Sequence, residues 1–316
     1  MTLPMQGVGL LFVVALRTIS MVTRLRGIDR VLRAFFDPAR IAERTFEVWL
    51  GNLKYRGRTS HFVDWNVLFY GAYEEADLLV LRMFAESDGV KVFADIGANV
   101  GQHALYLAPY CEKIVAFEPN AALHDQFLEN IELNALGNIE LKPIALGSSG
   151  ESVPLFLGGD SGESSLLRNA NRNDDTASIH VAVMRGDDVF DNVEGLGLVK
   201  MDVEGFEYSV LRGLKETLNK NRPVILLEIS NEGRRHFGSL DNFVRSFPKG
   251  YRFYAWSELR GLRRDKVLCA CGAAKAYEGY GNVYAVPDEK TQVFESALAS
   301  RPKCIRHAHM SYVRVV

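Results

Sequence analysis

The chain has 316 residues, of which 47% are hydrophobic and 24% are charged, and its formal net charge at pH 7 is −2. This length allows one sizeable α/β domain with additions, or two small domains. The near-neutral charge provides no general basic field, so we expect no nucleic acid among the partners. The four cysteines include one close-set pair, Cys269 and Cys271, without a second pair, which argues against a zinc site. Scattered thiols are typical of a reducing compartment, and we expect a cytoplasmic protein.

The N-terminal segment is apolar and leaves more than one interpretation open. Leu3–Thr23 carries a single charge, Arg17, and several arginines follow it. Its length could span a bilayer, but a central arginine costs about 2.5–3.5 kcal/mol on insertion scales. One interpretation is a helix packed on the domain or on a partner chain. The other is weak contact of residues 1–24 with an anionic inner membrane surface. The basic side chains that follow the apolar segment, Arg24, Arg26, Arg30 and Arg33, would favour such a surface.

Residues 25–70 predict a small extension ahead of the main domain. The stretch 25–45 indicates short helices, and Gly51-Asn52 between two apolar runs is a hairpin turn signal. A further helix enters through Gly71–Glu74 and ends at Ser87-Asp88-Gly89. We therefore place a helical and β extension at 1–70 and the start of the main domain at residue 71.

From Lys91 onward, strands and helices alternate. Such alternation predicts parallel pairing with right-handed crossovers. One helix carries Leu123, Phe127 and Ile131, and a later single helix runs from Phe206 to Leu218. The expected strands are Lys91–Ile96, Lys113–Phe117, Ile139–Leu146, Leu198–Asp202 and Pro223–Ile229.

The alternation is interrupted between Gly147 and Gly186. Two strands, Val153–Leu157 and Ile179–Val183, are expected there, joined by Gly158–Ser178, which is rich in Gly, Ser, Asn and Asp. Long loops inside a compact domain are usually functional or mobile. We interpret 147–186 as a flap on the substrate side, with a flexible surface loop as the alternative. The main domain then covers 71–290, and 291–316 form a tail.

A strand, a glycine turn and a helix start follow one another at Asp95-Ile-Gly-Ala-Asn-Val-Gly101. This arrangement is typical of the cofactor end of a doubly wound sheet. We expect the missing side chains of Gly97 and Gly101 to let the backbone approach a ligand. A dinucleotide fingerprint would need glycine at 97, 99 and 102, but Asn99 and Gln102 stand at the last two. An NAD-dependent oxidoreductase is therefore disfavoured, though it stays an alternative, as does a non-catalytic binding module.

Two further strand ends carry acidic side chains. Glu118 follows the second strand, where a carboxylate can accept hydrogen bonds from a ribose diol, although a helix N-terminal carboxylate is the alternative. Phe117 beside it either borders an adenine or belongs to the core. The fourth strand ends in Lys200-Met-Asp-Val-Glu-Gly-Phe-Glu207. Asp202 and Glu204 leave the sheet there, either toward a ligand or as caps of the next helix.

Together these motifs resemble a known family. The first motif resembles motif I of the class I S-adenosylmethionine methyltransferases. The two motifs together resemble the FkbM family, whose second motif is Lys-Ile-Asp-Val-Glu-Gly-Phe-Glu. This chain departs from that second motif at one position, Met201. The likeness extends from about Tyr73 to Val286 and includes Tyr73-Glu74, Asn130 with Asn134, and Gly281-Asn282. It implies a Rossmann-like doubly wound, mostly parallel seven-stranded sheet. It also implies a closing antiparallel C-terminal hairpin, formed by Tyr251–Trp256 and Asn282–Val286.

The resemblance also implies an activity and a site. The cofactor would be S-adenosylmethionine, and the acceptor a hydroxyl of a sugar, glycan or polyketide-like small molecule. Asp202 would lie near the transferred methyl group and Glu204 near the acceptor, and both are candidates for a general base, with Lys200 and His236 weaker ones. A divalent cation joining Asp202 and Glu228 to a sugar diol would suit their oxygens, but no spacing requires a metal. The expected cofactor-binding residues are Glu74, Asp95, Gly97, Ala98, Asn99, Gly101, Phe117, Glu118 and Asp202.

Overall fold

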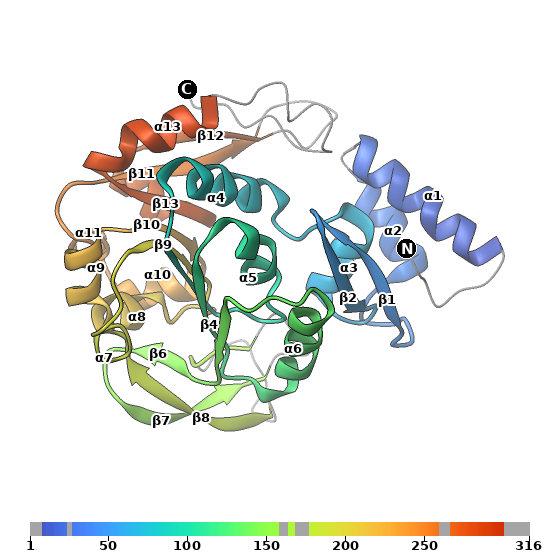
Figure 1. Cartoon of the computed structure of the whole chain (residues 1–316), viewed down its shortest axis with the longest axis horizontal. Helices are drawn as coiled ribbons and strands as arrows, with labels where there is room; N and C mark the ends of the chain where they lie inside the picture. The colour runs from blue at the N-terminus through green and yellow to red at the C-terminus, as the bar shows by residue number, and fades with distance from the viewer. Residues whose placement is uncertain (1–7, 24–26, 158–163, 168–176, 259–265, 300–316) are drawn as a thin grey trace.

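A computed structural model describes residues 8–23, 27–157, 164–167, 177–258 and 266–299 (Figure 1). Arg24, Arg26, most of Gly158–Ser178 and the tail beyond residue 299 lie outside these described residues. An eight-stranded sheet runs through the middle of the molecule, in the order β12-β11-β13-β10-β9-β3-β4-β5. Its strands are β3 (Val92–Ile96), β4 (Lys113–Phe117), β5 (Ile139–Lys142), β9 (Leu196–Met201), β10 (Val224–Ile229), β11 (Tyr251–Glu258), β12 (Lys266–Cys271) and β13 (Gly281–Pro287).

The topology confirms the predicted α/β doubly wound class and corrects the strand count. Strands β10, β9, β3, β4 and β5 pair in parallel, and β13 and β11 add the predicted antiparallel pair. The count of seven is wrong for the described residues, because β12 pairs with β11 as an additional edge strand. The segment between β11 and β13, expected to be a simple hairpin connection, contains β12 and α12 (Ala273–Glu278).

Helices cover both faces of the sheet because successive strand residues point to opposite sides. Phe93, Ile114 and Leu198 pack into one core, while the neighbouring residues Ala94 and Val115 pack into the other. The first core is covered by helices α4, α5 and α13, with α6 beside them, and the second by α8 to α12. The helices of the main domain are α4 (Glu75–Asp88), α5 (Gln102–Leu107), α6 (His124–Leu133), α7 (Gly186–Val189), α8 (Glu207–Gly213), α9 (Lys215–Asn221), α10 (Asn231–Phe237), α11 (Leu240–Arg245) and α13 (Thr291–Ala299). Short 3₁₀ turns occupy Ala108–Tyr110, Ala121–Leu123 and Asp288–Lys290.

Two predicted elements are divided in the structure. The single helix expected from Phe206 to Leu218 is two helices, α8 and α9. Gly213, where α8 ends, packs so closely that an added Cβ would lie 1.8 Å from the Gly147 carbonyl oxygen. The strand expected over Ile139–Leu146 ends at Lys142, because Pro143 has no N–H for the sheet. The chain resumes as β6 (Ala145–Gly147) in a different sheet.

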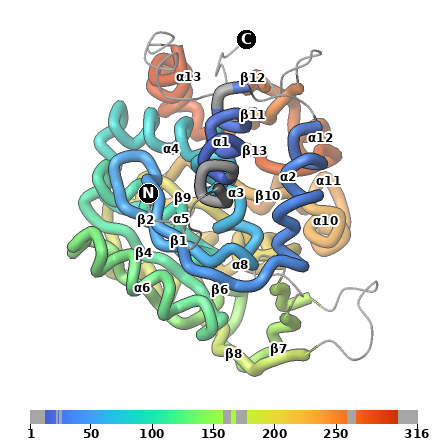
Figure 2. Tube along the Cα trace, turned by 90° about the vertical axis from the view of Figure 1, so that its right-hand side faces the viewer, coloured from blue at the N-terminus to red at the C-terminus, as the bar shows by residue number. Residues whose placement is uncertain are grey.

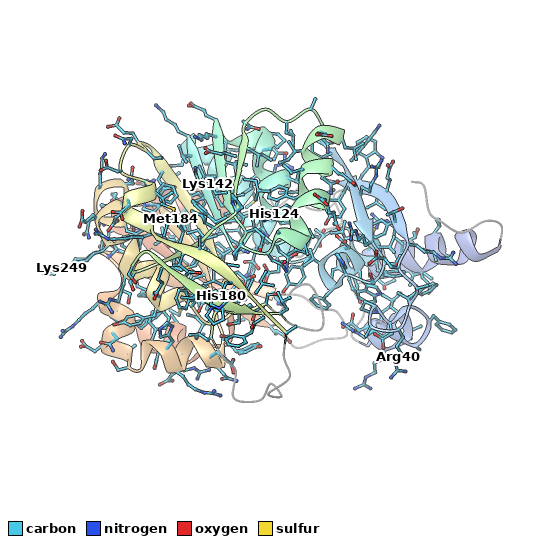
Figure 3. All side chains as sticks on the ribbon, turned by 90° about the horizontal axis from the view of Figure 1, so that it is seen from below. Arg40, His124, Lys142, His180, Met184 and Lys249 are labelled. Atoms are coloured by element: carbon cyan, nitrogen blue, oxygen red, sulfur yellow. The ribbon has the colours of Figure 1, made fainter. Side chains whose placement is uncertain are left out.

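That second sheet has the order β6-β8-β7 and lies below the main one in Figure 1. The expected strands around the flap are confirmed as β7 (Glu151–Phe156) and β8 (Ser178–Arg185), which pair antiparallel. Figure 3 views this sheet from below, with His180 and Met184 along β8. Its position brings Ser164–Leu167, the described part of the flap between the two strands, toward the helix-start turn at Glu204. There the Ser165 hydroxyl donates to the Glu204 carbonyl oxygen at 2.7 Å.

The N-terminal extension contains α1 (Val8–Thr23), α2 (Ile28–Phe36), the predicted hairpin β1 (Thr45–Leu50) and β2 (Leu53–Arg58), and α3 (Phe62–Tyr70). Asn130 and Asn134 of α6 attach the hairpin to the main domain. The Asn130 amide accepts from Arg56 N at 2.7 Å and donates to Arg56 O at 2.9 Å, and Asn134 makes the same pair of bonds with Lys54. These two asparagines therefore replace a third strand at the edge of β2.

Helix α1 packs on α3 through its polar residues. Arg17 donates to the carbonyl oxygens of Val67 and Leu68, and the Ser20 hydroxyl donates to that of Phe69. These carbonyls belong to the last turn of α3, where few helical partners remain, although that of Val67 also accepts the Gly71 N–H at 3.1 Å. Burial lowers the pKa of Arg17 to about 10. Among the described residues, no helix is long and apolar enough to cross a bilayer. Figure 2 shows the extension from the side on which α1 lies nearest the viewer.

Candidate functional site

A cavity of about 700 Å³ opens where β3, β4 and β9 end. Ligand sites of open α/β sheets lie at these carboxyl ends. Polar groups reach the cavity from Ala98 and Asn99 after β3, Glu118 after β4, and Asp202 and Glu204 after β9. The two predicted motifs therefore meet in one place. The N-terminal extension and the flap also contribute to its walls, through residues Arg33, Phe62, Ser164 and Leu166.

The glycines of the first motif are required by protein contacts. Gly97 has a φ of +79°, and a Cβ there would lie 1.8 Å from the Asp202 carbonyl oxygen. Gly101 has a φ of +80°, and its Cβ would lie 2.1 Å from the Phe127 ring. That a ligand also approaches the backbone here stays a prediction, and Gly97 does line the cavity. The missing side chain of Gly97 leaves room for the β9–α8 connection, and that of Gly101 leaves room for helix α6.

Asp95 lies beneath the turn and does not line the cavity. Its carboxylate is fully buried, and Oδ2 accepts the backbone N–H of Ala104 in α5 at 3.0 Å. Oδ1 lies 3.8 Å from Lys200 Nζ and has no hydrogen-bond partner. Burial raises the pKa of Asp95, and the positive charge of Lys200 opposes that rise. Asp95, which the sequence predicts as a cofactor contact, therefore supports the start of α5 and lies against the Lys200 ammonium.

Lys200 occupies the space between the two motifs. Its buried Nζ donates to the Gly97 carbonyl oxygen at 2.9 Å and lies 3.5 Å from Asp202 Oδ2. Burial alone would lower the pKa of Lys200, but the carboxylates of Asp202, Asp95 and Glu74 raise it above its ordinary value. Lys200 therefore stays charged at neutral pH. A permanently charged ammonium cannot accept a proton, which removes Lys200 from the candidates for a general base.

Glu118 is oriented by the backbone on both sides. Oε2 accepts Asn99 N–H and Oε1 accepts Asn120 N–H, each at 2.8 Å. Asn99 itself has a φ of +53°, which turns its N–H toward β4. Burial raises the pKa of Glu118, whereas the two N–H groups lower it. Each carboxylate oxygen keeps lone pairs for a further donor. Phe117 also lines the cavity, and the centre of its ring lies 5.7 Å from that of Phe190, with the two rings tilted by 53°.

Three carboxylates gather on the cavity wall. One oxygen each of Asp202, Glu204 and Glu228 lies within 4.8 Å of the others, a spacing that suits a divalent cation. Burial, followed by the charges of Asp202 and Glu204, raises the pKa of Glu228 to about 10. Burial therefore favours the protonated form of Glu228, which makes this residue a weaker candidate for the base than Asp202 and Glu204.

The turn that presents Glu204 is built from strained backbone and a buried acid. Glu204 has a φ of +52° and Gly205 one of +102°. The Glu207 carboxylate accepts Gly205 N–H at 3.0 Å and Val203 N–H at 3.3 Å. His236, a weaker candidate for the base, lies on α10 with Nδ1 3.1 Å from the Gly205 carbonyl oxygen, away from the cavity lining. It supports the turn that carries Glu204.

Glu74 lies beside this cavity and lines a second one of about 470 Å³. Its carboxylate accepts from Asn282 Nδ2 at 2.7 Å, and His103 Nε2 lies 3.6 Å from it. Burial, reinforced by Asp77 and Asp202, raises the pKa of Glu74 to about 8. Burial and then the Lys200 charge hold the pKa of His103 well below its usual range, so this imidazole is neutral. The exposed Tyr280 borders both cavities.

Sequence reasoning did not find the aromatic part of the wall. Tyr73 lines the cavity, and its backbone N–H and C=O are both bound by the Gln102 side chain, at 2.7 and 2.9 Å. Burial and the nearby carboxylates, Glu74 first, raise the pKa of Tyr73, so its hydroxyl keeps its proton. The Phe62 ring meets that of Tyr73 edge-on at 5.6 Å. Tyr73-Glu74 was part of the sequence resemblance, but α2 and α3 carried no signal for a site.

Comparison with known proteins gives the same family for both motifs. Residues 95–253, half of the chain, match the model of the methyltransferase FkbM domain. "Methyltransferase 1" of Beauveria bassiana is 32% identical over 143 residues, covering 39% of this chain and 57% of its own length. "Hexuronic acid methyltransferase AglP" of Haloferax volcanii is 31% identical over 155 residues, covering 48% of this chain and 61% of its own. The chain thus spans about three fifths of these curated relatives.

A solved structure of methyltransferase FkbM from Methylobacillus flagellatus superposes with a TM-score of 0.40 at 18% identity. The superposition covers 62% of this chain and 43% of that one.

Proposed function

Because the chain belongs to the FkbM family of S-adenosylmethionine-dependent methyltransferases, we propose that it transfers a methyl group to a hydroxyl of a sugar or glycan. The observation that carries this proposal is the wall formed by Asp202, Glu204 and Glu228 beside Tyr73. Carboxylates accept hydrogen bonds from the hydroxyls of a polyhydroxylated acceptor, and a protonated Glu228 and the Tyr73 hydroxyl can donate to its oxygens. A similar protein is named for action on a hexuronic acid.

The residues of the cavity fit the cofactor. Both Glu118 oxygens are held in place by backbone N–H groups and keep lone pairs for the two hydroxyls of a ribose. The cofactor carries positive charges on its ammonium and its sulfonium, and the carboxylate of Asp202 would complement them. Phe117, Leu123 and Leu146 supply apolar surface for a base. We propose that Glu118, Ala98 and Asn99 bind the cofactor directly, and that Asp95, Gly97 and Gly101 shape the turn that does so.

When bound, S-adenosylmethionine supplies an electrophilic methyl group on a positively charged sulfur. The residues of the chain then have three tasks, which are to orient the acceptor hydroxyl, to take its proton and to exclude water. Lys200 is fixed as a cation and Glu228 holds a proton, so the base is Asp202 or Glu204. Asp202 lies 3.5 Å from the Lys200 ammonium and is engaged in that ion pair. We therefore assign the proton transfer to Glu204.

Two titrations and one activity screen test the proposal. Calorimetry with S-adenosylhomocysteine is expected to show binding, and the same experiment with NAD⁺ to show none. Binding of NAD⁺ alone would support the oxidoreductase alternative, and binding of neither would support a non-catalytic module. Transfer of a labelled methyl group is then measured to methyl glycosides, glycans and polyketide-like hydroxyls. Transfer confined to polyketide-like acceptors, with no sugar methylated, would contradict the acceptor class.

Two further expectations stay proposals. The first is that residues 147–186 act as a flap over the acceptor, which is supported by Ser164 and Leu166 at the cavity and by the Ser165–Glu204 hydrogen bond. The second is that the N-terminal segment contacts a membrane surface. The packing of Arg17 and Ser20 on α3 favours the interpretation in which this face of α1 is turned to the protein. Val14 and Ile19 remain exposed on its other side.

A further inference from the structure

Two side chains with a permanent positive charge line the main cavity within the described part of the chain, Lys200 and Arg33. Lys200 is buried and engaged with the Gly97 carbonyl oxygen and two carboxylates. Arg33 is exposed and comes from α2, in the N-terminal extension. The cavity therefore combines an acidic interior, formed by Asp202, Glu204 and Glu228, with a cation from a separate part of the fold.

Arg33 is held in place by aromatic rings. Its guanidinium carbon lies 5.1 Å from the centre of the Trp65 ring and 5.8 Å from that of Phe62. Trp65 is fully buried, and its indole N–H donates to the Phe36 carbonyl oxygen at 2.5 Å. Figure 1 shows α2 and α3, which carry these residues, beside the β1–β2 hairpin. Stacking restricts the arginine before a ligand arrives, and reduces the entropy lost on binding.

We propose that Arg33 binds the carboxylate of an acidic sugar acceptor, such as a uronic acid, while the hydroxyl to be methylated lies at Glu204. This inference rests on the proposed function and adds the charge of the acceptor to it. An anion entering a cavity lined by the carboxylates of Asp202 and Glu204 is repelled unless a cation meets it. A guanidinium offers two parallel N–H donors that match a carboxylate. Phe62, whose ring centre lies 5.8 Å from the Arg33 guanidinium carbon, and Tyr73, whose ring meets that of Phe62 edge-on, also line this cavity and would supply apolar contact to a sugar.

The test uses two acceptors that differ in one group, methyl β-glucuronide and methyl β-glucoside. Arg33→Gln is expected to weaken binding of the glucuronide by about tenfold or more, the scale of a lost charge-assisted contact, and to leave the glucoside unchanged. Binding is measured by calorimetry with S-adenosylhomocysteine present, and KM and kcat are measured where turnover occurs. The KM for the glucuronide should rise with kcat nearly constant. Raising the salt concentration should weaken glucuronide binding to the wild type and not to the variant.

Arg40→Gln is the matched control, because Arg40 is an arginine of the same extension that is 87% exposed and pairs with Asp37 at 3.5 Å. Figure 3 shows it pointing away from the molecule. Equal effects of Arg33→Gln on both acceptors would overturn the inference, as would a wild type that binds the glucuronide no better than the glucoside. Loss of S-adenosylhomocysteine affinity in Arg33→Gln would assign the arginine to the cofactor's carboxylate instead. The S-adenosylhomocysteine titration of the wild type tests the proposed function separately from these outcomes.

Discussion

The carbonyl oxygen of Gly97 accepts a hydrogen bond of 2.9 Å from Nζ of Lys200. These residues are 103 positions apart, one in the turn after β3 and the other at the end of β9. The same ammonium lies within 4 Å of Asp95 and Asp202. The bond therefore joins the two sequence motifs into one site, and the buried charge of Lys200 neutralises part of the acid around it.

Replacing Lys200 should damage both the stability of the protein and the cofactor site, because its ammonium joins the two motifs. Lys200→Met leaves Asp95 buried without its cation, and breaking a buried ion pair costs about 3–5 kcal/mol of folding free energy. We expect a lower melting temperature and at least a tenfold loss of S-adenosylhomocysteine affinity. Lys220→Met is the control, since its ammonium is exposed and reaches Glu194 only at 4.0 Å. Wild-type stability and affinity in Lys200→Met would show that the two motifs do not depend on this bond.

Gly97→Ala should abolish cofactor binding because of the protein itself. The new Cβ would lie 1.8 Å from the Asp202 carbonyl oxygen, so the turn or the end of β9 must move. Gly89→Ala provides the comparison, because Gly89 also has a positive φ, +63°, with nothing within 4 Å of an added Cβ. Gly89→Ala should lose only about 1 kcal/mol of stability through backbone strain and keep full affinity. Calorimetry and thermal melting of both variants measure this, and equal behaviour of the two would contradict it.

Glu118→Gln should weaken S-adenosylhomocysteine binding by about 1.5–3 kcal/mol, the range for a hydrogen bond to a charged group. The substitution keeps the volume of the side chain but leaves one oxygen for two backbone donors and a ribose. Glu140→Gln is the control at the neighbouring strand, where the carboxylate is exposed and pairs with Lys113 and Lys142. A folded Glu118→Gln protein with unchanged affinity in calorimetry would remove Glu118 from the cofactor site.

The order of the strands and helices could be predicted from the sequence, and so could the proximity of the two motifs in the fold. Parallel strands place their carboxyl ends at one edge, so Gly97, Glu118 and Asp202 had to lie near each other once the alternation was recognised. The sequence could not show which contacts require each residue of the motifs. Asp95 and Gly101 belong to the motif, yet their partners are Ala104 N–H and the Phe127 ring, which no local pattern identifies.

The residues proposed to contact the acceptor could not be predicted from the sequence, for a different reason. Arg33 and Phe62 come from the extension, and only tertiary packing brings α2 and α3 to the cavity. The sequence of α2 is amphipathic and that of α3 is largely apolar, which is typical of packed helices, and neither contains a pattern that points to a ligand. The boundary proposed at residue 70 separates segments in sequence, but the hydrophobic core continues across it from Phe46 to Phe93.

Stability should fall as the pH rises toward neutrality, partly through Glu207. Burial raises the pKa of this carboxyl to about 7, above the value of 4.5 for the unfolded chain. The folded state therefore holds a proton that the unfolded state has lost between these pH values. This stabilising contribution is complete below about pH 4.5 and disappears as the pH passes 7. Melting temperatures from pH 4.5 to 8 should decline less steeply in Glu207→Gln than in the wild type, and parallel curves would contradict the assignment.

The last prediction concerns the proton of the acceptor. Glu204 lies on a turn with positive φ, which Gly205 and the Glu207 hydrogen bonds hold in place, and its side chain borders the cavity. Burial raises the pKa of Glu228, and the neighbouring carboxylates raise that of Lys200, so both residues favour the protonated form and are poor candidates for the base. Glu204→Gln should therefore lower kcat by about 10²–10⁴-fold, the usual range for a lost general base, with S-adenosylhomocysteine affinity nearly unchanged. Asp202→Asn should instead reduce cofactor affinity, turnover or both, because Asp202 also pairs with Lys200.

Glu232→Gln controls for the loss of a neighbouring charge, since Glu232 lies on α10 outside the cavity lining. Melting curves of all three variants establish that they are folded before kinetics are compared. If Glu204→Gln keeps wild-type turnover while Asp202→Asn loses it with cofactor still bound, Asp202 is the base. If both lose activity only together with their folded structure, the two carboxylates serve the helix start and the base lies elsewhere.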